Sequence, residues 1–169
     1  MPRLMHAPTP LKAWGRALAV AAVLLALSVV APGGAGAAAE AGDPALALVQ
    51  RFGMGRGLET LANEAAAGTV TYGSLSRKHG VAAAKQLVAT EIHRLLPDYQ
   101  ARWEQNLAAV YAKHFAPDEL RSLAAQGKRS PYAAKFSATH AAVASDMRAA
   151  SSGLLRQLVT EALLRAWNK

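Results

Sequence analysis

Two histidines hold positions from which they could do chemistry. His114 lies beside Tyr111 on the apolar stripe of one predicted helix, and His140 lies between Phe136 and Val143 on the stripe of a later helix. If these helices pack together, the imidazoles could meet as a metal site or a pH-sensitive pair. The chain has no cysteine and no His-x3-His or His-Glu-x2-His spacing. We therefore favour two histidines at the edge of a core, and we expect no metal and no cofactor.

The carboxylates do not form an evident acid–base pair. Glu59 and Glu64 are five residues apart and do not share a helix face, whereas Asp118 and Glu119 suit the start of a helix. Glu91 borders an apolar stripe without a marked partner, and no Gly-x-Ser-x-Gly motif occurs. We expect no catalytic residue and no enzyme activity. Hydrolysis of envelope polymers ranks last, because it needs a buried acid to face a second carboxylate in a cleft.

The segment Gly53-Met54-Gly55-Arg56-Gly57 has the composition of a phosphate-binding loop. Such a loop needs a strand before it and a helix after it. The residues before this segment have helical rather than alternating periodicity. The glycines therefore predict a helix break or a close-packing site.

The first 39 residues predict export. A basic start is followed by an apolar run at 17–31, a Pro-Gly-Gly turn and small residues. This order is typical of a secretory signal peptide, and the run is shorter than the ~20 residues that span a bilayer. We expect cleavage after Ala39, or after Ala37 as the alternative, and a periplasmic protein. The remaining alternative is an uncleaved anchor.

Residues 40–169 are long enough for one domain with its own core. Three of the 19 Lys and Arg residues precede residue 40, whereas all 11 Asp and Glu lie within residues 40–169, so the net charge falls from +8 to about +5. This excess favours an anionic envelope component as partner. Nucleic acid is disfavoured, because aromatic residues do not interleave the basic groups. We expect no membrane span in this part, and the sequence leaves the oligomeric state open.

The periodicity of residues 40–169 predicts an all-α fold, a single bundle of about five to six helices. The first helix begins at Asp43-Pro44, and a loop is predicted at 68–80. Pro97 predicts a helix boundary, because proline disfavours helical geometry in the residue before it. A kink is predicted at 151–153. The remaining predicted helices are 81–96, 97–115, 117–125 and 131–167.

Two tryptophans and two further histidines remain to be assigned to the core or to the surface. Trp103 and Trp167 continue apolar stripes and predict core or core-edge anchors. The alternative for Trp167 is contact with a partner or a membrane surface. His79 and His93 are expected to face solvent.

The stretch 109–136 carries a motif that combines aromatic, acidic and capping residues. Its members are Tyr111, Phe115, Asp118, Glu119, Leu120, Ser130, Pro131 and Lys135. The motif resembles the core of the domain-of-unknown-function family numbered 2059, small exported helical proteins of Gram-negative bacteria. The resemblance implies a periplasmic all-helical domain and no particular reaction. The residues alone explain the motif as structure, because Asp118 begins one helix and Ser130 caps the next.

These observations favour a non-enzymatic periplasmic protein that binds an envelope partner, either a protein or an anionic component. The alternative is a binder of a small apolar or lipid-like ligand between helices, because an alanine-rich core can leave space. That alternative requires a pocket of at least ~300 Å³.

Overall fold

The computed structural model describes residues 43–169, which fold into an all-α bundle, as predicted. These residues are 89% helical and contain no strand. The predicted export segment and its cleavage sites lie outside the described residues. The helices, in chain order, are α2 (Pro44–Arg51), the 3-10 helix η3 (Met54–Gly57), α3 (Leu58–Ala67), α4 (Val70–His79), α5 (Val81–His114), α6 (Pro117–Gln126), the 3-10 helix η4 (Gly127–Arg129), α7 (Ala133–Ala138) and α8 (His140–Trp167).

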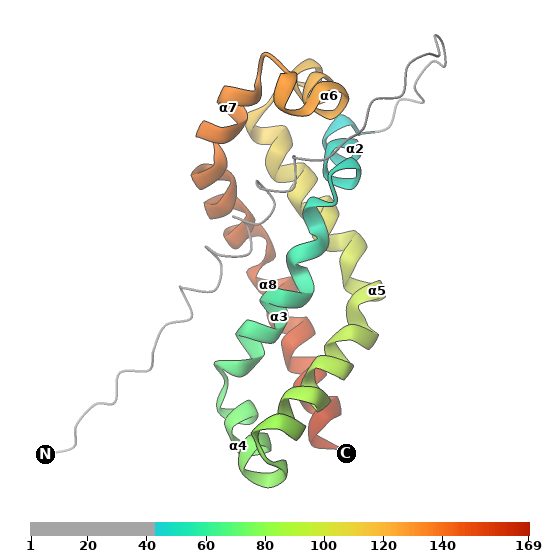
Figure 1. Ribbon diagram of the computed structural model, residues 1–169, viewed down its shortest axis with the longest axis vertical. Helices are drawn as coiled ribbons and strands as arrows, with labels where there is room; N and C mark the ends of the chain where they lie inside the picture. The colour runs from blue at the N-terminus through green and yellow to red at the C-terminus, as the bar shows by residue number, and fades with distance from the viewer. Residues whose placement is uncertain (1–42) are drawn as a thin grey trace, which may run out of the picture.

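Two long helices, α5 and α8, run antiparallel and form the axis of the molecule (Figure 1). The segmented column α2–η3–α3–α4 descends along them as the third member of the bundle. At one end α6, η4 and α7 connect α5 to α8, and α2 packs against α6 there. The opposite end holds α4, the start of α5 and the C-terminus.

One apolar core runs through the bundle. Its fully buried large side chains come from every α-helix except α7, and they include Leu48, Leu75, Ile92, Leu120 and Leu158. Burying one such leucine contributes about 1.5–3 kcal/mol. The core therefore explains why short segments such as α2 remain helical, since isolated helices of that length are unstable in water.

The predicted loop at 68–80 is wrong, because it contains α4. The side chain of Thr69 accepts a hydrogen bond from the Tyr72 backbone N–H at 3.1 Å and caps this helix. Leu75 is fully buried and attaches α4 to the core. The helix ends at Gly80, whose φ of 84° few other residues adopt.

The predicted boundary at Pro97 is also wrong. The proline lies inside α5, which continues for 34 residues. Its ring is exposed, whereas Leu95 and Trp103 on either side of it are buried. Packing of both halves of α5 against the bundle outweighs the roughly 3 kcal/mol that an interior proline costs a helix.

The last predicted segment breaks at Thr139 rather than at 151–153. The Thr139 hydroxyl donates to the Lys135 carbonyl and closes α7. Ser151 is buried within the continuous α8, where its hydroxyl oxygen accepts from the Asn106 side-chain amide of α5 at 3.0 Å. The α5–α8 contact thus holds the helix through the predicted kink.

The glycine segment breaks the first helix, as predicted. Gly53 ends α2 with a φ of 58°, and Gly55 packs closely against α5. A Cβ atom at Gly55 would lie 2.6 Å from Cγ of Glu104. Close approach to α5 therefore explains the glycine at this position.

Candidate functional site

A pocket of about 600 Å³ lies between α2, α6, α7 and the start of α8. It occupies the end of the bundle where the chain passes from α5 to α8 (Figure 1). Large apolar side chains come from Leu48 of α2, from Phe52 directly after it, from Met54 of η3 and from Leu123 of α6. The other lining residues are Gly127, Lys128, Ala133, Ala134, Phe136, Ser137 and His140.

The lining differs between the inside of the pocket and its rim. Leu48, Met54 and Leu123 are buried and form the floor, whereas Lys128 and Ser137 are exposed. The Ser137 hydroxyl donates to the Ala133 carbonyl at 3.2 Å. Lys128 has neither a hydrogen bond nor an ion pair within residues 43–169. The pocket is thus an apolar cavity with one unpaired cation at its edge.

An aromatic cluster backs one wall of the pocket. The Phe136 ring, which lines the pocket, stacks on Tyr111 with 5.4 Å between ring centroids and 7° between planes. Phe115 lies 5.9 Å from Phe136 and 6.2 Å from Tyr111, with tilted rings. Burial raises the pKa of the Tyr111 hydroxyl to about 12. The tyrosine therefore stays neutral at ordinary pH.

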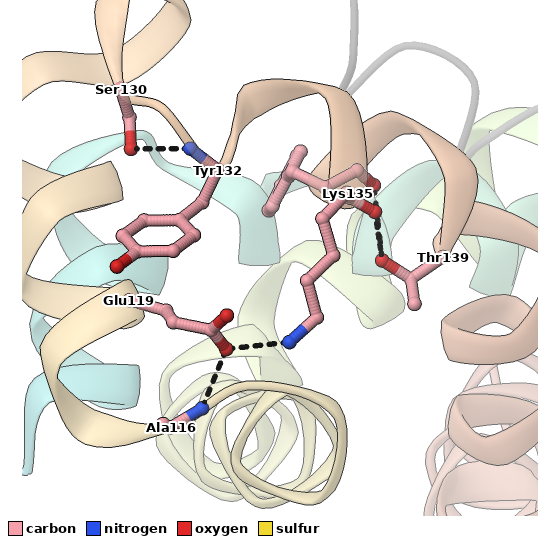
Figure 2. A network of polar contacts seen from close by, with 7 residues as sticks. Ala116, Glu119, Ser130, Tyr132, Lys135 and Thr139 are labelled. Atoms are coloured by element: carbon pink, nitrogen blue, oxygen red, sulfur yellow. Dashed lines mark hydrogen bonds and ion pairs between the residues drawn. The ribbon is translucent and has the colours of Figure 1, made fainter.

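A polar network holds α7 against the start of α6 (Figure 2). The Lys135 ammonium group lies 2.6 Å from Glu119 Oε2 and 4.8 Å from the Phe115 ring centroid. The same Glu119 oxygen accepts from the Ala116 backbone N–H at 2.9 Å. The hydrogen bond from Lys135, followed by that from Ala116, lowers the pKa of the Glu119 carboxyl. This carboxylate is thus kept charged as the link between the two helices.

The remaining motif residues have local partners. Buried Ser130 accepts from the Tyr132 backbone N–H at 3.2 Å, as Figure 2 shows, and shares a 2.9 Å hydrogen bond with Ser122. It fixes the turn before α7, which begins two residues after the predicted Pro131. Leu120 is buried and Asp118 is exposed. These contacts give the motif residues a structural role behind the pocket.

The two candidate histidines have different surroundings. His114 Nε2 lies 3.1 Å from Asp146 Oδ2 of α8, whereas His140 lines the pocket. Asp146 is six residues after His140, which corresponds to about 9 Å along a helix. No group of three His, Cys, Asp or Glu residues that could hold a metal occurs within 43–169. A His114–His140 pair stays a prediction.

The other two histidines differ in their exposure to solvent. His93 is exposed, as expected, and its Nδ1 lies 3.2 Å from Glu59. The expectation for His79 is wrong, because this residue is half-buried and its Nε2 atom is buried without a hydrogen-bond partner. His79 is the last residue of α4, a helix that packs against α5 and α8 and that the loop prediction missed.

The buried acid of the bundle is Glu91, which is 4% exposed. Its Oε1 atom lies 2.9 Å from Arg94 and 3.9 Å from Lys169, so its partners are cations rather than a second carboxylate. Trp103 is a core residue, as predicted. Trp167 is 43% exposed, and the Lys78 ammonium group lies 5.6 Å from its ring centroid.

Comparison with protein-family models, with curated proteins and with solved structures finds no match for this chain. Within residues 43–169, no helix combines the length and the apolar character needed to cross a membrane. The site must therefore be interpreted from its own chemistry.

The residues behind the pocket can be identified from the sequence, whereas the lining residues Phe52 and Met54 cannot. Phe52 and Met54 lie at the glycine-rich break, where no helical stripe continues. The sequence marks this part of the pocket only by two large apolar residues beside glycines. That pattern does not distinguish a pocket from a core.

Proposed function

We propose that this chain is an exported, non-enzymatic binding protein of the periplasm that holds a small apolar or lipid-like molecule between α2, α6, α7 and α8. The observation that carries the proposal is the pocket of about 600 Å³ with its apolar floor. Its volume lies within the roughly 300–1,000 Å³ that small-molecule sites in proteins occupy. The predicted signal peptide at 1–39 and the resemblance of the motif around Tyr111 and Phe115 are what support the periplasmic location.

The physical case rests on the side chains that face the pocket. Ala133 and Ala134 of α7 are small, so this helix leaves space beside Leu48 and Leu123 that larger residues would fill. Apolar area removed from water contributes about 25 cal/mol per Å², so a hydrocarbon group gains free energy by entering. Neither the lining nor the network behind it contains a carboxylate pair suited to acid–base catalysis.

The first experiment is to purify the exported protein from cells that express the full chain. Native mass spectrometry and organic extraction then test for a co-purifying apolar molecule. In parallel, the uncharged fluorescent probe N-phenyl-1-naphthylamine is titrated into the delipidated protein. We expect the probe to bind with increased fluorescence, and the extracted molecule to displace it.

A matched pair of variants locates the site. Ala134→Trp places an indole in the pocket and is expected to weaken probe binding at least tenfold. Ala138→Trp is the control, because Ala138 is an exposed residue of the same helix that does not line the pocket. Equal binding by both variants would contradict the proposed site, and absence of binding by the parent protein would contradict the function.

A second candidate function is docking to an envelope partner. The observation that favours it is a group of exposed apolar side chains on the first residue of α5 and the last turn of α8, two segments that lie at the end of the bundle opposite the pocket (Figure 1). Val81, Leu164 and Trp167 belong to this group, and Lys78 lies beside Trp167. In-cell crosslinking tests it: a partner lost in Leu164→Ser/Trp167→Ser but kept in Ala134→Trp would support docking at this end.

We also propose, on the motif described above, that the chain is similar to the domain-of-unknown-function family numbered 2059. The network joining Glu119, Lys135 and Phe115 gives the motif a physical reason, since these residues fix α7 against α6. Intact-mass analysis of the purified protein tests the export proposal. A chain that begins at Ala38 or Glu40 is expected, whereas a chain that retains residues 1–39 would contradict it.

A further inference from the structure

We infer that the pocket takes an anionic amphiphile, with the anionic head group at Lys128 and the apolar tail on the floor formed by Leu48, Met54 and Leu123. The inference rests on the proposed function and assigns the chemical class of its ligand. A free fatty acid and an acidic membrane lipid share this chemistry.

The first observation is the charge of the lining. Lys128 is its one lysine or arginine, and none of the described lining residues is acidic. Lys128 also lacks an intramolecular counter-charge within residues 43–169. By contrast, nearby Lys135 is paired with Glu119, and Arg121 is paired with Asp118. Of these three cations, Lys128 is the one without an ion pair among the described residues, so its charge remains available to a ligand.

The second observation is the place of Lys128 in the fold. Gly127 ends α6 with a φ of 56°, a conformation that favours glycine, and η4 follows at once. This sharp turn puts Lys128 on the pocket wall while its side chain stays exposed. A lysine that is both lining and exposed lies at the rim, where its aliphatic stem can cover apolar surface and its ammonium group can remain in water.

The third observation is the direction of the polarity gradient. The buried floor is apolar, and the exposed rim carries Lys128 and the Ser137 hydroxyl. A wholly apolar ligand would fill the floor but would make no interaction with the charge at the rim. An amphiphile satisfies both parts, because its tail enters the floor and its head group stays at the solvent edge beside the ammonium group.

The test uses three ligands of equal chain length as competitors of N-phenyl-1-naphthylamine: laurate, dodecanol and dodecylamine. The protein is the exported form purified from cells that express the full chain. We expect laurate to bind about three- to tenfold more tightly than dodecanol, which is the range of an ion pair at a partly exposed rim. Dodecylamine is expected to bind most weakly.

Variants assign the preference to one side chain. Lys128→Gln is expected to weaken laurate binding about three- to tenfold and to leave dodecanol binding unchanged. Arg129→Gln is the matched control, since it removes the same charge from the next residue, which is exposed and does not line the pocket. A long-range effect of net charge would weaken laurate binding equally in both variants, and that result would overturn the inference.

The outcomes separate the inference from the function it rests on. If the probe binds and Lys128→Gln leaves the order of the three ligands unchanged, the anionic head group is overturned while the apolar site stands. If neither the probe nor any competitor binds, the proposed function itself fails. Lysophosphatidylglycerol is tested beside laurate to distinguish an acidic membrane lipid from a free fatty acid as the ligand. The compound that displaces the probe at the lower concentration indicates the class, and either result supports the inference.

Discussion

At the scale of single residues, the Phe136 ring makes two kinds of contact. It stacks on the Tyr111 ring, and it also lines the pocket. Such aromatic pairs add about 0.5–1.5 kcal/mol beyond their buried area. The cluster therefore stabilises the end of the bundle and fixes the pocket wall with the same side chain.

Tyr111 makes this cluster sensitive to high pH. Its pKa of about 12 in the folded protein exceeds the value of about 10 in an unfolded chain, so the hydroxyl resists ionisation when folded. Stability from this group is complete below pH 10 and is lost as the pH rises through 12. Between pH 8 and 11 we expect the parent's free energy of unfolding to fall by about 1 kcal/mol more than that of Tyr111→Phe. Urea unfolding at both pH values measures this, and an equal fall in the two proteins would contradict it.

Gly55 and Gly153 are expected to respond oppositely to alanine. At Gly55 a Cβ atom would meet Cγ of Glu104 at 2.6 Å, so Gly55→Ala should destabilise the protein by about 1–3 kcal/mol. At Gly153, inside α8, a Cβ atom meets nothing within 4 Å. Gly153→Ala should therefore stabilise by about 0.5–1 kcal/mol, the usual gain for a helix interior. Thermal unfolding compares them, and a gain at both positions would show that η3 does not depend on close approach to α5.

At the scale of elements, α5 and α7 differ most in length and in the number of buried residues. α5 contacts α2, α3, α4 and α8, so its length is set by the partners along it. α7 has six residues, none of them buried, yet it supplies four of the pocket-lining residues. It is held by Phe136, by the Lys135–Glu119 pair and by the Ser130 turn. The element that closes the pocket is thus the one with the least core of its own.

Pro97→Ala is expected to stabilise the protein. Removing an interior proline relieves a helix of a cost of about 3 kcal/mol. The substitution also makes the unfolded chain less restricted, which lowers the free energy of unfolding by up to about 1 kcal/mol. A net gain of about 2 kcal/mol should appear in urea unfolding. Pro117→Ala is the control, because Pro117 is the first residue of α6, where proline is tolerated and no comparable gain is expected. If Pro97→Ala gave no gain, the proline would have to be accommodated without a cost to α5.

At the scale of the whole molecule, the described residues share one core. A single buried cluster joins α2 through α6 with α8, and Phe136 of α7 packs against it. The end with the pocket and the end with Trp167 are therefore parts of one packing unit. Small domains with a continuous core unfold in a single transition.

Unfolding should accordingly be cooperative. In the protein without residues 1–39, and hence without Trp14, tryptophan fluorescence reports on Trp103 in the core and on Trp167 near the C-terminus, while far-UV circular dichroism reports on all helices. We expect the two signals to give the same urea midpoint within error. Ala138→Trp adds a probe on α7, and its fluorescence should follow the same transition. An earlier transition in that variant alone would show that the pocket end unfolds independently.

The sequence by itself determined the features that depend on neighbours along the chain. Helical periodicity predicts the all-α class, Asp43-Pro44 predicts the start of α2, and the helix predicted at 117–125 is α6. The glycines at 53–57 predict the break between α2 and α3. Capping and periodicity act within one or two helical turns, so they can be read locally.

Only the tertiary structure decided the features that depend on distant partners. Burial on both sides of Pro97 carries α5 through the proline, and the Asn106–Ser151 contact carries α8 through its predicted kink. α4 is helical where a loop was predicted, because Leu75 reaches the core. The pocket draws its lining from the four α-helices α2, α6, α7 and α8 and from the 3-10 helices η3 and η4. No local pattern specifies such a space, since its shape is set by the packing of segments far apart in the chain.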